Sequence, residues 1–342
     1  MIRPSLLTAL ALASLLVPSA RAQGEPFPVE KNVVNKDDGV VWYVDGRQRI
    51  PSHVSIQSLR ACRIVARGEE AVLEVEGKLD LRAATGGNIA LENVWIEPWP
   101  GCKGLVLLNC EFQGGGLRTA PEGAAAVEIL LHSSNLGKGA RLDLDLFDGE
   151  FNILSSSFVE PAVIRGAAKD EKSKNLLDLR ITNCKGGGGG GGGRGGGGGP
   201  GNGPAAGFAA GLRLEGVHKA LVRNCSLAGE ESVFSDCEDF VFDGNLASSK
   251  RVEFRQSQPK SFGGTQIATT DFDCDRLVLF QPASLSGPQK LRLDRCWFDG
   301  RTEEQRVRAE ILEDAENNPE SGVVASLFKI QAVPLGFGGR PR

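Results

Sequence analysis

The sequence predicts an all-β protein built from short strands of similar sequence. Apolar and polar residues alternate in runs such as LVLLNCEF at 105–112, and this two-residue period is typical of strands with one buried face. Related runs return after roughly 21–27 residues, which is typical of one small unit stacked on itself. Beyond residue 22, only residues 301–316 show the period of a helix.

The first 22 residues predict an export signal. Arg3 gives a positive start, residues 6–17 are apolar, and Ala20-Arg21-Ala22 has the small-x-small pattern of a signal peptidase site. The apolar stretch is shorter than the ~18–20 residues that a membrane span needs. We therefore expect cleavage after Ala22 and an exported, periplasmic or extracellular protein with no membrane span.

The charge argues against nucleic acid as a partner. The chain carries 39 basic and 43 acidic residues, and loss of residues 1–22 would remove two arginines and no acid. The mature net charge would then be −6. Because basic clusters supply most of the affinity for nucleic acid, no such partner is expected.

Residues 23–61 are expected to form an N-terminal hairpin that caps the repeats. The stretch VVWYVDGRQRI at 40–50 has strand-forming residues on both sides of Asp45-Gly46. An Asp-Gly pair suits the two positive-φ positions of a tight hairpin turn.

Residues 62–300 contain the repeats. Each repeat has a polar residue that we interpret as a bend between two strands; these markers are Asn109, Asn135, Ser156, Asn183, Asn224, Asn245 and Arg295. The interval from Asn245 to Arg295 can hold an additional turn, with residues 269–277 between. A β-sandwich or propeller is the alternative, but it would show longer strands and more two-residue turns.

The repeated L-x-L-x-N-C-x-F type of pattern resembles the right-handed parallel β-helix of pectate lyases and related proteins. The resemblance covers about residues 62–300 and points to a fold, not to a specific enzyme family. It implies coils that stack along one axis and share a continuous core.

The Asn-Cys pairs are interpreted as a bend followed by an interior residue. Asparagine adopts the left-handed conformation cheaply, and stacked asparagines can hydrogen-bond to one another. The next residue then points inward, which makes four cysteines small, unbridged interior residues: Cys110, Cys184, Cys225 and Cys296. The pairing of four others is left open: Cys62, Cys102, Cys237 and Cys274. With no Cys-x-x-Cys and three histidines, a zinc site is not expected.

Two segments depart from the repeat. Residues 186–210 are rich in glycine and are expected to be a disordered insertion extruded from one coil. Residues 301–342 are expected to form a helix over 301–316, a strand over 322–333 and a tail. The helix begins with a capping box formed by Thr302 and Gln305 and is expected to cover the open end of the stack.

Candidate catalytic residues are the alternating carboxylates Asp271, Asp273 and Asp275, with Phe272 and Cys274 pointing inward between them. Carboxylates two residues apart on a strand lie ~6.6–7 Å apart, within the ~6.5–9.5 Å range of inverting glycosidases. Asp143 and Asp145 form a similar pair. No cofactor is expected, although such pairs could hold Ca²⁺ with help from another coil. The favoured interpretation is a solvated acidic face, because any strand with one exposed side offers such pairs.

Candidate ligand-binding residues are Trp95 and Trp99, which lie beside Pro98 and Pro100 and could stack on sugar rings. Loop packing is the alternative for both. A further stretch, residues 211–242, resembles the active coils of pectin methylesterases, with Glu230-Glu231 in place of Gln-Asp. Glu231 and Asp239 are only eight residues apart, too close to stack on successive coils.

We therefore expect an exported, non-catalytic β-helix protein that binds polysaccharide or a cell-envelope surface. The alternative is a polysaccharide lyase or glycoside hydrolase that uses outer-face carboxylates, and a carbohydrate esterase is less favoured. A purely structural role is the third possibility. A groove that gathers two or more carboxylates with an Arg or Lys would favour an enzyme.

Overall fold

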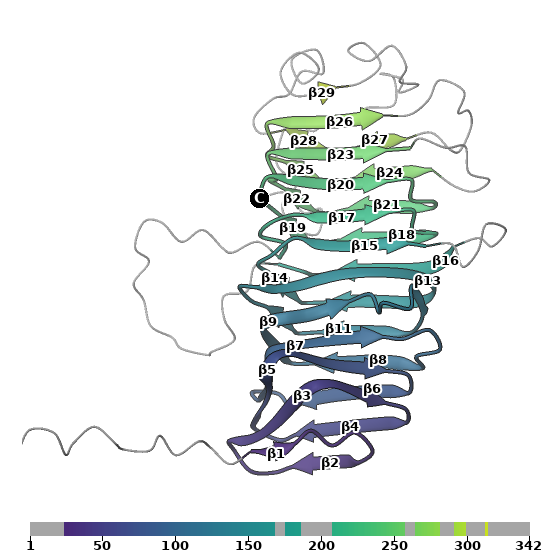
Figure 1. The fold of residues 1–342 in the computed structure, drawn as a ribbon. Helices are drawn as coiled ribbons and strands as arrows, with labels where there is room; N and C mark the ends of the chain where they lie inside the picture. Colours follow the sequence, from purple (N-terminus) through teal and green to yellow (C-terminus); the bar gives the residue numbers. More distant parts are fainter. Residues whose placement is uncertain are drawn as a thin grey trace, which may run out of the picture.

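The computed structural model describes residues 24–167, 175–185, 207–256, 264–280, 291–298 and 312–313. Over these residues the chain is an all-β solenoid whose coils stack along one axis, from the purple strands at one end to the green strands at the other (Figure 1). The strands of successive coils pair in parallel. No described residue lies in a helix, so the predicted parallel, all-β architecture is confirmed. Nor does the described part of the chain contain a helix capable of crossing a membrane.

Each coil runs through three sheet faces. The first face begins with β1 and the first parts of four long strands, and it continues through short strands. Phe208 bridges two of these short strands, at Phe158 and at Leu227. Its strands are β1 (Glu25–Pro26), β3 (Val40–Ile50), β5 (Ala61–Val75), β7 (Asn88–Pro98), β9 (Cys110–Arg118), β12 (Asn135–Leu136), β14 (Ser157–Phe158), β19 (Ser226–Leu227), β22 (Leu246–Ala247), β25 (Asp271–Phe272) and β28 (Trp297–Phe298).

The second face contains the second parts of β3, β5, β7 and β9, because these four strands bend from one face to the next. It continues through β13 (Ala140–Leu154), β15 (Ala162–Gly166), β17 (Leu212–Glu215), β20 (Glu231–Ser235), β23 (Arg251–Arg255), β26 (Arg276–Phe280) and β29 (Leu312–Glu313).

The third face contains the second part of β13, to which β10 (Ala125–Ala126) also pairs. Its other strands are β2 (Asn32–Asn35), β4 (His53–Ser58), β6 (Lys78–Ala83), β8 (Gly104–Leu108), β11 (Ile129–His132), β16 (Leu176–Thr182), β18 (Lys219–Arg223), β21 (Phe240–Asp243), β24 (Thr265–Ala268) and β27 (Arg292–Asp294).

The hairpin expected at 40–50 is wrong. These residues form one strand, β3, which pairs in parallel with β5 on both sides of a register shift between Asp45 and Arg47. Gly46 has a φ of 60°, whereas Asp45 does not adopt a positive φ, and a tight hairpin turn of this kind needs both. The Asp-Gly pair therefore marks a bend between two faces, and β1 to β4 belong to the solenoid itself.

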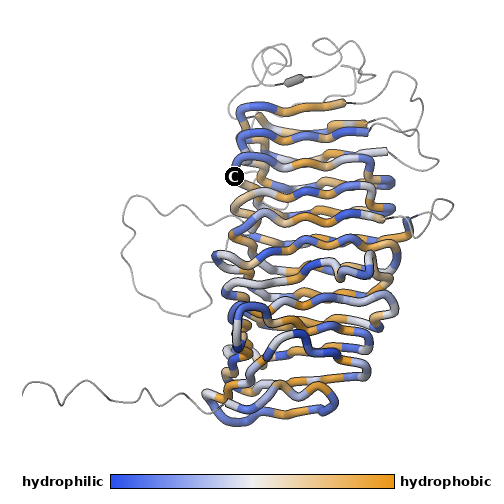
Figure 2. The backbone as a smooth tube through the Cα atoms, in the orientation of Figure 1, coloured by the Kyte–Doolittle hydropathy of each residue, from blue (hydrophilic) through white to orange (hydrophobic). Residues whose placement is uncertain are grey.

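The core is one continuous apolar column inside the three faces. Hydrophobic and hydrophilic residues alternate along the strands (Figure 2), as in β16, where Leu177, Leu179 and Ile181 are at most 1% exposed. Full burial of such a side chain contributes roughly 1.5–3 kcal/mol. Farther along, aromatic rings stack between coils, with Phe272 and Phe298 centred 5.3 Å apart.

A column of positive-φ residues marks the corner between the third and first faces. The predicted bends at Asn109, Asn183, Asn224 and Arg295 are confirmed, with φ of 53–56°. Three predicted bends are wrong, because Ser133, Ser155 and Gly244 take this conformation in place of Asn135, Ser156 and Asn245. Thr269, with a φ of 44°, supplies the additional turn expected between Asn245 and Arg295.

The residue after each bend forms what we call the corner column. All its members are at most 2% exposed, and each is small and able to form hydrogen bonds: Cys110, Ser134, Ser156, Cys184, Cys225, Asn245, Thr270 and Cys296. Ser134 Oγ lies 3.1 Å from the oxygen of His132 and 3.2 Å from that of Leu107, one coil earlier. The sulfur of Cys225 makes the equivalent contacts with Arg223 and Ile181. The column therefore satisfies carbonyl groups that turn inward at the corner.

The four cysteines of the corner column are interior residues, as expected, and all eight cysteines are free and buried. This includes the four whose pairing the sequence left open. Burial raises the pKa of the Cys62 and Cys102 thiols to about 11 and that of Cys296 to about 12. Raised pKa values keep the thiols neutral and suppress their reactivity.

The glycine-rich insertion is shorter than expected. Residues 186–206 lie outside the described part, but Phe208, within the predicted disordered range, is fully buried and stacks on Phe158 at 4.7 Å. Gly207 approaches Cys184 so closely that a Cβ there would lie 2.0 Å from the Cys184 carbonyl oxygen. The two ends of the insertion therefore meet at one corner.

Most of the predicted C-terminal helix, and all of the predicted strand over 322–333, lie outside the described part of the chain. Within its range, Leu312 and Glu313 form β29, which pairs in parallel with Leu277 and Val278 of β26. These two residues are therefore strand, because the exposed edge of β26 offers backbone partners that a helix cannot use.

Ser134→Ala is expected to lower the free energy of unfolding by about 1–3 kcal/mol, because Ser134 Oγ accepts a hydrogen bond from the buried Cys110 N–H at 3.1 Å. Cys110→Ser is the matched control and should cost about 1 kcal/mol or less, since serine occupies this position in the next two coils. Urea unfolding of both variants makes the comparison. Equal costs for the two would contradict the role assigned to the corner column.

Deleting residues 186–199 should leave the thermal midpoint nearly unchanged, because residues 185 and 207 already lie at the same corner and loop length adds little to closure entropy. Differential scanning calorimetry of the deletion variant measures this. A midpoint lowered by more than about 5 °C would show that the deleted residues stabilise the solenoid.

Candidate functional site

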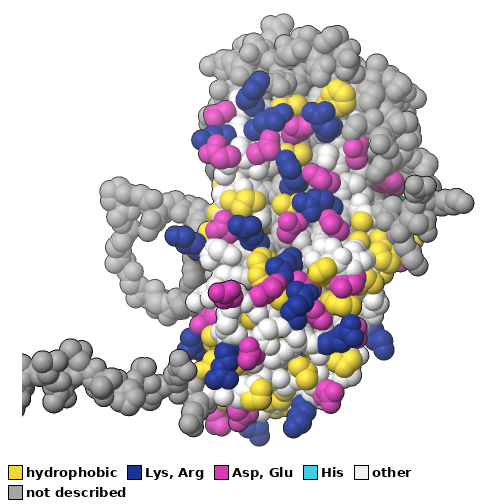
Figure 3. Space-filling view, viewed as in Figure 1, with side chains coloured by type: hydrophobic (Ala, Val, Ile, Leu, Met, Phe, Trp, Pro, Cys, Tyr) yellow, Lys and Arg dark blue, Asp and Glu magenta, His cyan; other side chains and the backbone are white. Residues whose placement is uncertain are grey.

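The outward side of the second face is dense in paired charges. Lys and Arg side chains alternate with Asp and Glu along the length of the solenoid (Figure 3). The pairs link strands of successive coils, because each strand lies beside its neighbour in register. Two groups of ion-paired residues lie on this surface, one in each half of the solenoid.

The group in the C-terminal half is a zigzag of ion pairs, here called the charge ladder. Arg165 Nη1 lies 2.7 Å from Asp143 and 3.1 Å from Asp145. Burial lowers the pKa of Arg165, but the hydrogen bonds to these two carboxylates outweigh it and raise the pKa. The ladder continues through Glu215, Arg213, Glu231, Arg251, Glu253 and Arg255 at separations of 2.6–3.7 Å.

The group in the N-terminal half, here called the tryptophan cluster, is centred on Glu97. The Glu97 side chain is 1% exposed and receives hydrogen bonds from Arg47 and, at 2.7 Å, from Arg118. Burial lowers the pKa of Arg47, yet its hydrogen bonds to Glu74 and Glu97 raise it overall. The other members are Arg49, Glu70, Glu76, Trp95 and Trp99.

Trp95 and Trp99 both belong to this cluster, on either side of Glu97. Each ring is half-buried, and a guanidinium lies over it: Arg118 at 4.6 Å from the Trp95 ring and Arg49 at 4.8 Å from Trp99. The Trp99 indole N–H is buried with no acceptor among the described residues. The rings are therefore held by cation–π contact, within one polar surface.

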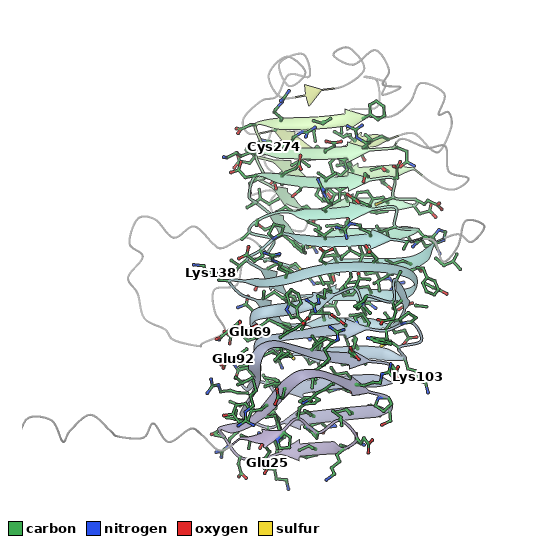
Figure 4. The ribbon with its side chains drawn as sticks, in the orientation of Figure 1. Glu25, Glu69, Glu92, Lys103, Lys138 and Cys274 are labelled. Carbon is green, nitrogen blue, oxygen red and sulfur yellow. The ribbon has the colours of Figure 1, made fainter. Side chains whose placement is uncertain are left out.

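The three candidate aspartates do not form one open set. Asp271 is 1% exposed on the first face, whereas Asp273 and Asp275 are exposed at the next corner. The inward alternation is as expected, since Phe272 and Cys274 are buried; Cys274 lies near β25 (Figure 4). The other pair, Asp143 and Asp145, is bound to Arg165.

The residues that resemble an esterase site are also separated. Glu231 is on the second face, paired with Arg213 and Arg251, and Glu230 is bound to Lys250 at 2.7 Å. Asp239 precedes β21 on the third face. Carboxylates on different faces cannot act on one ester.

A pocket of about 320 Å³ lies on the outward side of the third face. Glu150 and Asp178 are direct partners in register on β13 and β16, and Lys219 on β18 is the next residue in the same row. Lys219 Nζ lies 3.9 Å from Asp178. The lining is completed by Asp148, Gly149, Leu176 and His218.

His218 is held in place from two sides. Its Nδ1 lies 3.0 Å from Glu238 Oε2, and its backbone N–H donates to Asn175 Oδ1 at 3.2 Å. Among the described residues none hydrogen-bonds His218 Nε2, which leaves that nitrogen for a ligand or water. A carboxylate that orients a histidine in this way is a common arrangement for acid–base chemistry.

In the described part of the chain, no group of three or more His, Cys, Asp or Glu side chains could hold a metal ion. Asp143 and Asp145, one of the pairs considered for Ca²⁺, direct their oxygens to Arg165.

The pocket could not be predicted from the sequence. Glu150, Asp178 and Lys219 come from three coils that differ in length, so their register cannot be read from spacing. Likewise, the sequence suggested a hairpin turn at Asp45-Gly46 and no bend at Gly114, so it did not predict the contacts of Trp95 and Trp99 with arginines.

No family model matches the chain, and comparison with curated proteins and with solved structures finds no similar protein. The resemblance to pectate lyases is therefore supported for the parallel β-solenoid alone. Function must be argued from the site itself.

Glu97→Gln should lower the free energy of unfolding by about 1–3 kcal/mol, because it removes the buried charge that faces Arg47 and Arg118. This is less than the 3–5 kcal/mol of a fully buried pair, as both arginine side chains are about one-third exposed.

The matched control is Glu92→Gln. Glu92 lies at the edge of the solenoid (Figure 4) and pairs with the half-exposed Arg63, so its loss should cost about 1 kcal/mol or less. Chemical unfolding of both variants measures the difference. If the two costs match, Glu97 does not hold the tryptophan cluster together.

Proposed function

We propose that this chain is an exported β-solenoid that binds polysaccharide, including polysaccharide at a cell-envelope surface, through the outward side of its second face. The observation that carries the proposal is one continuous surface on which two arginine-covered tryptophans adjoin a ladder of ordered arginines and carboxylates. Binding of this kind requires no catalytic residue.

The geometry of the face suits an extended polymer. Parallel strands lie ~4.8 Å apart, so similar polar groups recur at a regular interval along the solenoid. Ion pairing already holds the guanidinium groups in place, so that less side-chain freedom is lost on binding. Half-exposed aromatic rings supply apolar surface for the C–H faces of sugars.

Export is part of the proposal and depends on residues 1–22, which lie outside the described part of the chain. The proposal also includes a right-handed sense of coiling, as in pectate lyases, because crossovers between parallel strands of one sheet are right-handed in nearly all proteins.

Trp95→Ala and Trp99→Ala should each weaken polysaccharide binding at least about tenfold, since truncation of a central tryptophan commonly costs 2 kcal/mol or more. Affinity electrophoresis in gels that contain a panel of polysaccharides measures this. Trp297→Ala is the matched control, because Trp297 is also half-buried but lies on the first face. Equal retardation of all three variants and the native chain would exclude the second face as the binding site.

A second candidate, a glycoside hydrolase, is favoured by the pocket and not by Asp271, Asp273 and Asp275. Glu150 and Asp178 are in register on adjacent strands that lie ~4.8 Å apart, so these side chains can place two carboxyl groups at the ~5–5.5 Å separation of retaining glycosidases. Three carboxylates against one lysine also disfavour an anionic uronate, the substrate of a lyase. Release of reducing ends that Asp178→Asn abolishes would support a hydrolase, and no release from any polysaccharide that the protein binds would exclude it.

A further inference from the structure

We infer that the ligand of the second face is a neutral, hydroxyl-rich polysaccharide and not a polyanion. This inference rests on the proposed binding function and names the chemical class of its ligand. It depends on how the arginines of the charge ladder and the tryptophan cluster are already bound.

Three of the four arginines of the charge ladder face carboxylates on both sides, and the fourth, Arg255, binds Glu253 and lies over the Phe280 ring. Arg213 lies between Glu215 at 3.7 Å and Glu231 at 3.3 Å. Arg251 lies between Glu231 at 2.9 Å and Glu253 at 2.7 Å. A sulfate or uronate group would therefore have to displace a carboxylate that is already bound.

The arginines of the tryptophan cluster are engaged in the same way. Arg118 binds Glu70 at 2.6 Å and Glu97 at 2.7 Å. The hydrogen bond from Arg118 is the main reason that the pKa of Glu70 is lowered, so this carboxylate stays charged well below neutral pH. Arg49 binds Glu76 at 3.2 Å while it covers Trp99.

The charge balance also opposes a polyanion. The two groups together contain seven arginines and nine carboxylates, a net charge of −2: Arg47, Arg49, Arg118, Arg165, Arg213, Arg251 and Arg255 against Glu70, Glu74, Glu76, Glu97, Asp143, Asp145, Glu215, Glu231 and Glu253. Two further exposed arginines on the same strands, Arg141 and Arg276, bring the charge of the face to zero. Attraction of a polyanion requires a surface of opposite net charge, which a neutral face does not provide.

The same pairing suits hydroxyl groups. A guanidinium has five N–H donors and a carboxylate about four acceptor positions, and one ion pair uses only part of each. Unused donors and acceptors therefore lie side by side along the ladder, where the four arginine side chains are 38–46% exposed. A sugar hydroxyl both donates and accepts, so a neutral glycan can bind without breaking any ion pair.

The experiment compares neutral and anionic probes in affinity electrophoresis at low and high salt. The probes are hydroxyethylcellulose and galactomannan on one side, polygalacturonate and alginate on the other. We expect the native chain to bind at least one neutral probe with less than about twofold change between low and high salt, and to bind neither polyanion. Salt-sensitive binding to a polyanion without binding to a neutral probe would overturn the inference and leave the proposed function intact. Binding to none of the four would contradict the proposed function itself.

A charge-neutralising variant tests the cause. Glu231→Gln releases Arg213 and Arg251 from their shared carboxylate and should create salt-sensitive binding to polygalacturonate. Glu128→Gln is the matched control: it changes the net charge equally, but Glu128 is exposed and forms no ion pair with a described residue. If Glu231→Gln gains no more polyanion binding than Glu128→Gln, pairing is not what excludes polyanions.

Discussion

The structure depends on the hydrogen bonds that hold one corner of the solenoid in register. At this corner a positive-φ residue turns the chain, and the following small side chain bonds to carbonyl groups of its own coil and of the coil before. Because side chains alternate along a strand, a slip of one residue here would turn the whole core outward. The corner thus fixes which residues face the core and which reach solvent.

The alternation of inward-facing and outward-facing residues that this corner sets also produces the charged surface of the second face. Once alternate residues are committed to the core, the remaining positions of the second face stack in rows, and opposite charges on neighbouring strands come into contact. The charge ladder results from this stacking, while Glu97 sits deep enough to hold Arg47 and Arg118 beside the tryptophans. On the third face the same stacking places Glu150, Asp178 and Lys219 in one row. A solenoid of this kind builds extended surfaces more readily than single deep sites.

Much of the fold was predictable from the sequence. The alternation of apolar residues reports local backbone preferences, and so do four bend residues: Asn109, Asn183, Asn224 and Arg295. The errors arose where two neighbouring polar residues both suit a bend, as at Ser155 and Ser156, and where Asp45-Gly46 fits a hairpin and a bulge equally well. Phe208 was assigned to the insertion because its neighbours are mostly glycine and alanine, yet burial of one ring decides its place. The surface groups were harder to predict, since coils of unequal length hide which charges become neighbours.

The reactivity of the cysteines is the most direct test of which residues face the core, because all eight cysteines are free and buried and four belong to the corner column. A thiol reagent added to the native protein at pH 8 should label none of them rapidly, and denaturation without reductant should expose all eight. Rapid labelling of Cys110 in the folded protein, or fewer reactive thiols than eight after denaturation, would contradict the account.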